Sequence, residues 1–277
     1  MNKFAFVLTF FFSLSALASN VILMVGDGMG FNHLKCAERN LFMETLPVKG
    51  KIETKSFDNA TTDSSAAATA YACGQKTNNG WLSVLPNGKN CLTIAEEAIQ
   101  KGYFVGIVST DIRTGATPSA FYAHTKNRRG ADEIEAQLEQ AQKSMDIHVA
   151  VQNIEQETAD ILTSASQSGK EFFIMIEGAN IDVESHKKNL KNMQKELKEF
   201  DNSVKLVYDF INKNKDTTLI VLADHETGGL TEACAYTTNK HTGVDVPMFA
   251  YGAGQSQFNG TFDNTEIYKK MKNILFN

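Results

Sequence analysis

VILMVGDGMG, residues 21–30, decides the fold, because it joins a short apolar run to a glycine-rich turn that carries a carboxylate. The run at 21–25 is too short for a buried helix and is rich in branched residues, which predicts a buried strand. Similar runs follow at 104–108, 172–176, 219–222 and 246–251, and helical patterns lie between them at 92–101, 131–144, 154–166 and about 182–212. This alternation predicts an α/β fold of three layers, with helices on both faces of a mainly parallel central sheet.

Residues 1–18 have the pattern of a secretory signal peptide. Lys3 precedes an apolar run at 4–14, and the small residues around Ala16 and Ala18 suit a cleavage site. A membrane anchor is the alternative, but a bilayer span needs about 20 apolar residues. We therefore expect a periplasmic or secreted protein with no stable membrane insertion after cleavage. Residues 19–277 are expected to form a single domain, because no repeat or Pro/Gly-rich linker divides them.

The charge balance and the cysteine content limit the classes of function that this protein can have. Lys and Arg number 27 against 32 Asp and Glu, which gives a formal net charge of −5 at pH 7. A dedicated nucleic-acid binder normally presents a basic face, so this balance argues against one. An even number of cysteines permits two disulfides in three possible pairings after export, and the absence of a Cys-x-x-Cys pair makes cysteine metal ligation the weaker interpretation. The cysteines are Cys36, Cys73, Cys91 and Cys234.

Polar and ionisable residues directly follow four of the predicted strands. Asp27 follows the first strand, Asp111 the second, Glu177 the third, and Asp224 with His225 the fourth. In open α/β sheets, ligands bind at the carboxyl ends of the strands. We therefore expect these side chains, which are far apart in the sequence, to converge on one crevice.

Three histidines have neighbours or positions suited to a metal site. Asp182 and His186 are four residues apart at a helix start and so face one side, although a solvated helix face has the same spacing. Asp224 and His225 follow an apolar run, where a turn capped by aspartate is the alternative. His241 opens an HTG segment before the last strand, where a histidine is often merely exposed. Their association at one predicted edge indicates metal ligation.

Oxygen ligands are available for a harder cation. Asp27 lies in a G-D-G-M-G turn, which lacks the G-x-G-x-x-G spacing of dinucleotide sites. A carboxylate there would repel phosphate unless cations intervened, which favours a metal site. Thr117 and Glu177 supply further oxygens suited to magnesium, although each alone has an ordinary structural explanation.

One serine and one of two arginines have the character of a phosphate site. Ser64 begins an alanine-rich helical segment in TTDSSAAATAYACG, residues 61–74. There it is either a helix cap or, at the positive end of the helix dipole, a nucleophile for phosphoryl transfer that a metal ion activates. Arg128 or the adjacent Arg129 can bind two phosphate oxygens, or both can be solvated.

Six segments together resemble the alkaline phosphatase family in their order and internal spacing. They are VILMVGDGMG, TTDSSAAATA, GATPSAFYAH with an arginine four residues later, IEGANIDVESH, LADHETGG and HTG. They extend from residue 21 to residue 243, so the resemblance covers most of the chain. It implies an alkaline-phosphatase-like fold and the hydrolysis of small phosphate monoesters.

The resemblance gives each matched residue a role. Ser64, directly after the family's aspartate at Asp63, would be the nucleophile that is transiently phosphorylated, and Arg128 would bind the phosphate. The implied cofactors are two Zn²⁺ and one Mg²⁺, with no organic cofactor. The ligands would be Asp182, His186 and His241 for one zinc, Asp27, Asp224 and His225 for the other, and Asp27, Thr117 and Glu177 for magnesium.

The sequence departs from the family pattern near the expected magnesium ligands and in the length of two segments between the matched motifs. Val183 stands where several relatives carry Lys or His, and Gly115 stands where relatives often have Asp or His near the magnesium. Both put the identity of the third metal in doubt. The connections at 129–176 and 226–240 are shorter than the insertions of many relatives. A homodimer is possible, but the family's dimer contacts do not simply carry over.

Two other functions remain open on the sequence. A phosphodiesterase or sulfatase of the same superfamily would use the same fold, but Arg128 favours the extra charge of a monoester. A non-catalytic periplasmic protein that binds zinc or phosphate would keep the ligands and would have no need of Ser64. Comparing rates on a monoester and a diester tests the first alternative, and a Ser64→Ala variant tests the second.

Overall fold

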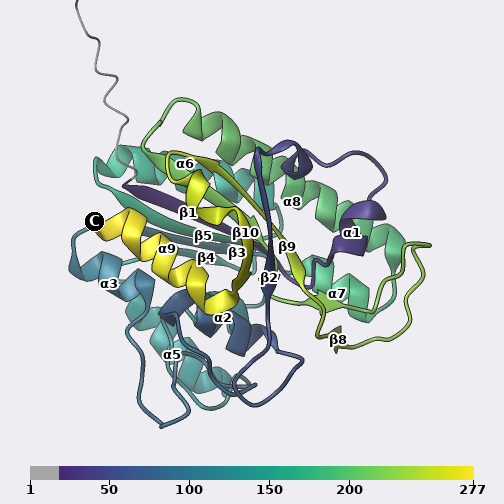
Figure 1. Ribbon diagram of the computed structural model, residues 1–277. Helices are drawn as coiled ribbons and strands as arrows, with labels where there is room; N and C mark the ends of the chain where they lie inside the picture. Colours follow the sequence, from purple (N-terminus) through teal and green to yellow (C-terminus); the bar gives the residue numbers. More distant parts are fainter. Residues whose placement is uncertain (1–18) are drawn as a thin grey trace, which may run out of the picture.

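The computed structural model describes residues 19–277, so the signal peptide expected at residues 1–18 lies outside the described region. One eight-stranded sheet runs through the molecule (Figure 1). Its strands are β1 (Asn20–Gly26), β2 (Val48–Glu53), β3 (Phe104–Ser109), β4 (Asp146–Val149), β5 (Phe172–Gly178), β6 (Thr217–Leu222), β9 (Val246–Gly252) and β10 (Gly260–Asp263). A separate pair consists of β7 (Glu226–Thr227) and β8 (His241–Thr242). The helices are α1 (Phe31–Lys35), α2 (Ser64–Cys73), α3 (Ile94–Gln100), α4 (Ala116–Ser119), α5 (Ala131–Ala141), α6 (Ile154–Ser168), α7 (Asn180–His186), α8 (Leu190–Ile211) and α9 (Asn264–Phe276), with short 3-10 turns at η1 (Met43–Thr45) and η2 (Gln255–Phe258).

The sheet is mainly parallel, as the sequence predicts. Its strands lie in the order β10-β2-β9-β6-β1-β5-β3-β4. β9 pairs antiparallel with β2 and β6, and the other neighbouring pairs are parallel. Every residue of β1, β5 and β6 is buried, which explains their continuous apolar sequences, since a central parallel strand is covered on both faces.

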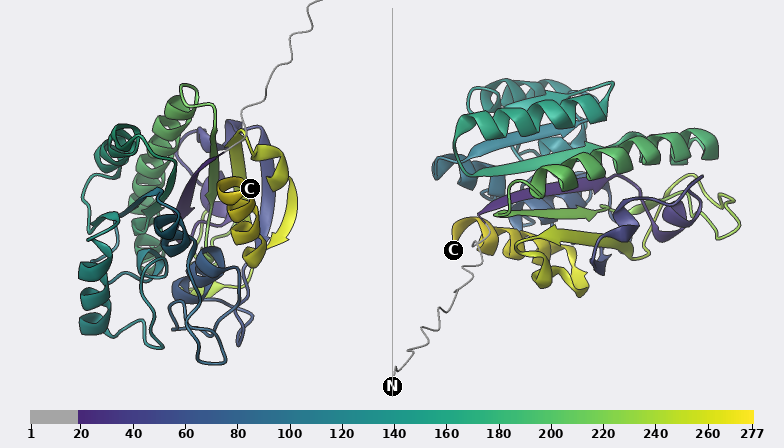
Figure 2. Two further views of the ribbon diagram at one scale, coloured as in Figure 1. Left: turned by 90° about the vertical axis from the view of Figure 1, so that its left-hand side faces the viewer. Right: turned by 90° about the horizontal axis from the view of Figure 1, so that it is seen from above.

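Helices cover both faces of the sheet and complete the three layers (Figure 2). α6 and α8 pack on each other and over β3, β1 and β6, whereas α2, α3 and α9 pack together on the opposite face. α8 presents buried apolar side chains at three- and four-residue spacing, which is the pattern of a helix with one face on a core. They include Met193, Leu197, Phe200, Val204, Val207 and Ile211.

The prediction of one long helix at about 182–212 is wrong, because the structure has two helices there. α7 ends at His186 and α8 begins at Leu190. Between them Lys188 has a left-handed φ of 55°, and the Asn189 side chain accepts the N–H of Asn192 to begin the second helix. α7 still packs against α8, and it begins directly after the carboxyl end of β5.

Two disulfides pair the four cysteines. Cys36, at the end of α1, bonds to Cys234 in the loop after β7, and Cys73, the last residue of α2, bonds to Cys91 before α3. The sequence left this pairing open. Among the helices of residues 19–277, none has both the length and the apolar character that crossing a bilayer requires.

Candidate active site

Neighbouring strands bring the predicted site residues to one edge of the sheet. β1 and β5 pair in register up to Gly26 and Gly178, which places Glu177 opposite Val25 and Asp27 just beyond the last pair, at the same end of the two strands. β6 lies on the other side of β1 and is followed closely by Asp224. The structure therefore brings these distant carboxylates together at the carboxyl ends of the strands.

The buried cluster consists of Asp27, Asp224 and His225, each of which has a ligand atom within 4.8 Å of those of the others. His225 Nε2 is 3.4 Å from Asp27 Oδ1 and 3.2 Å from Asp224 Oδ2. The backbone N–H groups of Gly28 and His225 donate to Asp224 Oδ1 and fix that carboxylate. All three cluster residues are buried, so the cluster is shielded from water.

The outer cluster consists of Asp182, His186 and His241, whose ligand atoms meet the same 4.8 Å limit. Asp182 and His186 lie one turn apart on α7, with His186 Nε2 3.2 Å from Asp182 Oδ2. His241 comes from β8, and its Nε2 is 3.2 Å from His186 Nε2 and 3.7 Å from Asp182 Oδ1. The rings of His225 and His241 stack with their centroids 3.6 Å apart, so the two clusters adjoin.

Hydrogen bonds orient the outer-cluster rings toward a shared centre. His186 Nδ1 is 2.8 Å from the carbonyl oxygen of Asn239, and His241 Nδ1 is 3.1 Å from that of Thr62. A carbonyl only accepts, so each ring carries its proton on Nδ1 and presents the Nε2 lone pair to the cluster. When both rings are neutral, two such lone pairs face each other at 3.2 Å, and a cation between them relieves this repulsion. This arrangement is typical of metal-ligating histidines.

Ser64 is the first residue of α2 and lies beside the buried cluster. Its Oγ is 3.2 Å from His225 Nε2, and the side chain is buried. Asp63 rather than Ser64 caps the helix, because its carboxylate accepts the N–H of Ala66 at 3.0 Å. The Ser64 hydroxyl is therefore free of the capping role, and it lies at the positive end of the helix dipole.

Arg128 reaches the same end of α2. Its Nη1 donates to Asp63 Oδ2 at 3.0 Å, and its backbone N–H donates to the carbonyl of Gly80. Gly80 in turn donates to Asp63 Oδ2 at 2.9 Å. Arg129 is exposed. Of the two arginines, Arg128 is thus the one that lies next to the residue preceding Ser64.

The third group consists of Asp27, Thr117 and Glu177, the oxygen ligands expected for magnesium. Thr117 lies in α4 and Glu177 near the end of β5, and all three side chains are buried. Ser109, at the end of β3, donates to Glu177 Oε2. Asp27 belongs to both the third group and the buried cluster.

Unpaired polar atoms in these groups fit cations. Asp27 Oδ1, Asp224 Oδ2, Glu177 Oε1 and Thr117 Oγ1 are buried and have no hydrogen-bond partner. Buried polar atoms are normally paired, so these four oxygens are available to coordinate bound cations. Burial raises the pKa of Asp224 to about 7 and, with Asp224 close by, raises that of Asp27 well above its usual value. Bound divalent cations would neutralise this repulsion.

Two side chains that support the site were not found by sequence reasoning. The sequence analysis used Asp63 only to identify Ser64 as the matching serine, but in the structure Asp63 caps α2 and binds Arg128. Thr227 Oγ1 donates to Asp182 Oδ1 and lies 3.3 Å from His225 Nδ1, so it connects the outer cluster to the buried one. Thr227 stands in the LADHETGG segment, two residues after His225, which is the only signal that could have drawn attention to it.

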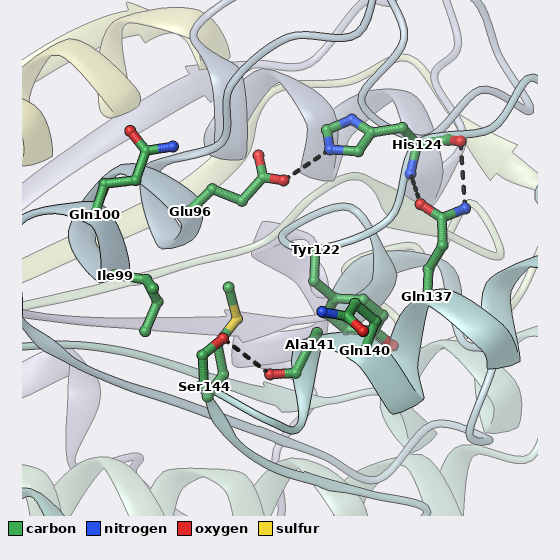
Figure 3. A pocket seen from close by; sticks show the side chains of 10 residues that line it. Glu96, Ile99, Gln100, Tyr122, His124, Gln137, Gln140, Ala141 and Ser144 are labelled. Atoms are coloured by element: carbon green, nitrogen blue, oxygen red, sulfur yellow. Dashed lines mark hydrogen bonds and ion pairs between the residues drawn. The ribbon is translucent and has the colours of Figure 1, made fainter.

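A cavity of about 380 Å³ lies between α3 and α5, and its lining includes none of the cluster residues (Figure 3). His124 lines it, with Nε2 2.9 Å from Glu96 Oε1 and Nδ1 3.0 Å from the carbonyl oxygen of Ser83. The backbone N–H of His124 donates to Gln137 Oε1. These contacts hold the segment before Arg128 against both helices, so His124 has a structural role outside the metal clusters.

Comparisons with known proteins agree with this geometry. The family model described as alkaline phosphatase matches residues 18–164, 154–237 and 230–276. Alkaline phosphatase 4 of Bacillus subtilis (strain 168) is 24% identical over 409 residues, which cover 93% of this chain and 88% of the relative. The alkaline phosphatase of Escherichia coli (strain K12) is 24% identical over 405 residues, which cover 93% of this chain and 86% of the relative. Both aligned spans are longer than this chain, so these relatives carry insertions. A variant of the TAB5 alkaline phosphatase with Mg bound in its M3 site superposes with a TM-score of 0.84 at 26% identity, covering 92% of this chain and 97% of that chain.

Proposed function

This chain belongs to the alkaline phosphatase family of hydrolases, and we propose that it releases inorganic phosphate from phosphate monoesters by way of a phosphoserine at Ser64. The observation that carries the proposal is the position of Ser64 Oγ, 3.2 Å from His225 Nε2 in the buried cluster. The family is metal-dependent, and the two clusters are candidate metal sites. A hydroxyl between a cation site and a helix N-terminus is well placed to attack phosphorus.

The donor atoms favour zinc in both clusters and magnesium in the third group. Each cluster combines carboxylate oxygens with imidazole nitrogens, which zinc accepts readily, whereas the third group offers only oxygens. Burial lowers the pKa of His225 well below its usual value and also lowers that of His241, so both rings are neutral ligands at working pH. When bound, the zinc ions would act as Lewis acids that lower the pKa of the Ser64 hydroxyl and neutralise charge on the phosphoryl and leaving oxygens.

Ser64 performs both halves of the proposed reaction. Its Oγ forms a bond to phosphorus as the ester oxygen of the substrate leaves with the alcohol. Water then displaces Ser64 from phosphorus, which releases inorganic phosphate and restores the hydroxyl. The N-terminus of α2 stabilises the negative charge on the phosphoryl group in both steps, because the free N–H groups and the helix dipole point toward it.

Arg128 is proposed to hold the phosphoryl oxygens during both steps. Asp63 restrains its guanidinium through one nitrogen, which leaves other N–H groups available for a bidentate contact. A monoester carries one more negative charge than a diester and gains more from this cation. We therefore propose monoesters as substrates in preference to diesters or sulfates. The charged residues of the site address the phosphoryl group, so broad specificity for the alcohol is expected.

Export to the periplasm or the medium remains part of the proposal. The sequence at residues 1–18 has signal-peptide character. The Cys36–Cys234 and Cys73–Cys91 disulfides support it, because such bonds persist mainly in oxidising compartments. Residues 19–277 are proposed to act as a single catalytic domain.

Replacement of two adjacent serines tests the nucleophile. Ser64→Ala should lower the hydrolysis of p-nitrophenyl phosphate by about 10³-fold or more while the zinc content stays near that of the wild type. Ser65→Ala is the matched control, because Ser65 lies at the next position of α2 and donates to the Asp63 carboxylate. It should still form the phosphoserine, which mass spectrometry of acid-quenched protein would locate. An unchanged rate in Ser64→Ala, or phosphate on Ser65, would refute the assignment.

Substrate comparison and metal analysis test the reaction class. The rate on p-nitrophenyl phosphate should exceed the rates on bis(p-nitrophenyl) phosphate and p-nitrophenyl sulfate, and Arg128→Ala should reduce that preference. Metal analysis of the purified protein should find zinc and magnesium. A zinc-loaded protein without phosphatase activity at alkaline pH would overturn the proposal.

A further inference from the structure

His33 is a fully buried histidine that belongs to neither metal cluster. It is the third residue of α1, and its side chain is 0% exposed. Burying an imidazole is unfavourable unless its ring nitrogens have hydrogen-bond partners. The partners of His33 therefore indicate what this side chain does.

The ring of His33 closes the turn that follows Asp27. The backbone N–H of Gly30 donates to His33 Nδ1 at 3.2 Å, and the backbone N–H of His33 donates to the Gly30 carbonyl at 3.0 Å. In this arrangement, called a capping box, the side chain of the third helical residue binds the backbone just before the helix. Gly30 comes three residues after Asp27, so the ring holds the turn on which this metal ligand lies.

The other nitrogen of the same ring reaches α7. Because Nδ1 accepts a hydrogen bond, the neutral ring carries its proton on Nε2. Nε2 lies 3.0 Å from Ser185 Oγ and donates to it, and Ser185 Oγ donates to the carbonyl of Ile181 at 2.7 Å. Burial lowers the pKa of His33 to about 4, so the ring is neutral at neutral and alkaline pH.

Ser185 lies between the two metal ligands that α7 supplies. Asp182 is three residues before it, and His186 is the next residue. α7 has only seven residues, and a helix this short depends on contacts with other elements for its stability. Asp27 and Asp224, in contrast, follow closely after buried strands of the sheet. The outer cluster is therefore the one whose geometry depends more on a contact such as that of His33.

We propose that His33 is a positioning residue that fixes the spacing of the two metal clusters, because one ring bonds both the turn after Asp27 and the helix of Asp182 and His186. This inference rests on the proposed function, since it concerns the zinc sites of that function. A ring held at both nitrogens keeps α7 in place before zinc binds, and such preorganisation increases affinity. Without the ring, α7 must become ordered when zinc binds, so the outer cluster should lose affinity.

Zinc affinity in competition with a chromophoric chelator tests the proposal on zinc-stripped protein. His33→Leu removes both ring contacts and should weaken the more weakly bound zinc ion about 10- to 100-fold. The Gly30 N–H still donates to the Gly28 carbonyl in this variant, and the Ser185 hydroxyl still donates to Ile181. His33→Gln should stay within about threefold of the wild type. The reason is that an amide offers an acceptor and a donor side by side, as the neutral ring does, and glutamine also forms capping boxes.

Two further variants complete the test. Ser185→Ala removes the contact at its far end and should weaken the same zinc ion, so it tests the proposal even if His33→Leu folds poorly. His148→Leu is the matched control, because it removes a histidine with two carboxylate partners on β4, the strand at the far edge of the sheet. It should keep the zinc affinity of the wild type. The melting temperature of the zinc-free protein is measured as well, because a purely structural contact would lower it and leave the zinc affinity unchanged.

The outcomes separate this proposal from the proposed function. Wild-type zinc affinity in folded His33→Leu or in Ser185→Ala would overturn the proposal, and so would an equal loss in His33→Leu and His33→Gln. An equal loss in His148→Leu would show that the effect is not specific to His33, with the same consequence. None of these measurements needs phosphatase activity. A protein that shows the expected zinc affinities but hydrolyses no phosphate monoester would therefore overturn only the proposed function.

Discussion

Thr227 is expected to position metal ligands in both clusters. It is fully buried, its Oγ1 donates to Asp182 Oδ1, and the same oxygen is 3.3 Å from His225 Nδ1. The His225 N–H donates to the hydroxyl oxygen, so the hydroxyl proton is free for Asp182. This relay of two hydrogen bonds, from His225 to Thr227 and from Thr227 to Asp182, fixes the tautomer in which His225 Nε2 carries no proton and faces the buried cluster.

Thr227→Val removes the relay and keeps the shape of the side chain. The variant leaves the buried Nδ1–H of His225 without its acceptor and Asp182 Oδ1 without its donor. An unpaired buried polar group costs about 1–3 kcal/mol. Loss of an outer partner of a metal ligand weakens metal affinity about 10- to 100-fold, or about 1.4–2.7 kcal/mol, which is the same range. We therefore expect weaker zinc binding and a similar loss of kcat.

Competition with a chromophoric chelator measures the zinc affinity, and initial rates on p-nitrophenyl phosphate measure kcat. Thr227→Ser is the matched control, because serine keeps the hydroxyl and loses only a methyl group. It should retain zinc affinity within about threefold of the wild type, well inside the expected loss for valine. Wild-type affinity in Thr227→Val would refute the argument, and equal losses in both variants would show that packing of the methyl group, not the hydroxyl, supports the site.

Three further outcomes follow from the structure. Gly28 has a φ of 72°, and a Cβ added there would lie 2.9 Å from Asp182 Oδ1. Gly28→Ala should therefore destabilise the fold by at least about 1 kcal/mol in thermal unfolding and weaken zinc binding, and an unchanged melting temperature would contradict this. Asp63→Ala should lose a helix cap worth about 1 kcal/mol and also weaken inhibition by phosphate through Arg128. Asp63→Asn keeps one oxygen for the cap and loses the carboxylate contacts with Arg128 and the Gly80 N–H, so it should melt above Asp63→Ala, and equal melting temperatures would argue against the cap. Burial lowers the pKa of His33 from 6.5 to about 4, so between these pH values the unfolded chain binds more protons than the folded protein and the free energy of unfolding falls as the pH decreases. His33→Gln should remove up to about 3 kcal/mol of that loss, measured by urea titrations at pH 7 and pH 4. An identical change in the free energy of unfolding between the two pH values in variant and wild type would exclude the effect.

The central strands could be predicted from the sequence because burial on both faces makes their residues continuously apolar. β1, β3, β5, β6 and β9 all correspond to predicted runs. β2, β4 and β10 were missed, because β2 has exposed residues alternating along most of its length and β4 and β10 lie at the two edges of the sheet, where most of their residues are at least partly exposed. Their pairing depends on tertiary contacts rather than on an apolar run. The break between α7 and α8 was missed for a similar reason, since Lys188 carries no sequence signal for its left-handed conformation.

The site was partly predictable for a different reason. Asp182 and His186 share a helix face by their spacing, and Asp224 with His225 follows a buried strand, so local pattern alone brought each pair to the correct edge. Which nitrogen each ring presents depends on partners far away in the sequence. His241, for example, is oriented by the carbonyl of Thr62, which no spacing rule connects to it. Supporting residues are therefore the part of a site that requires coordinates.

The short connection before His241 raises the question of how this residue is held without a large insertion. The β7 and β8 pair spans it, and the Glu226 carboxylate accepts the N–H groups of Gly229 and Leu230 and the hydroxyl of Thr242. The Cys36–Cys234 disulfide anchors the same loop to α1. A loop closed by one carboxylate and one covalent bond has few conformations to lose when a metal binds. Local hydrogen bonds and a disulfide thus hold the 15-residue connection between His225 and His241, which explains how a short loop can present His241 to the outer cluster.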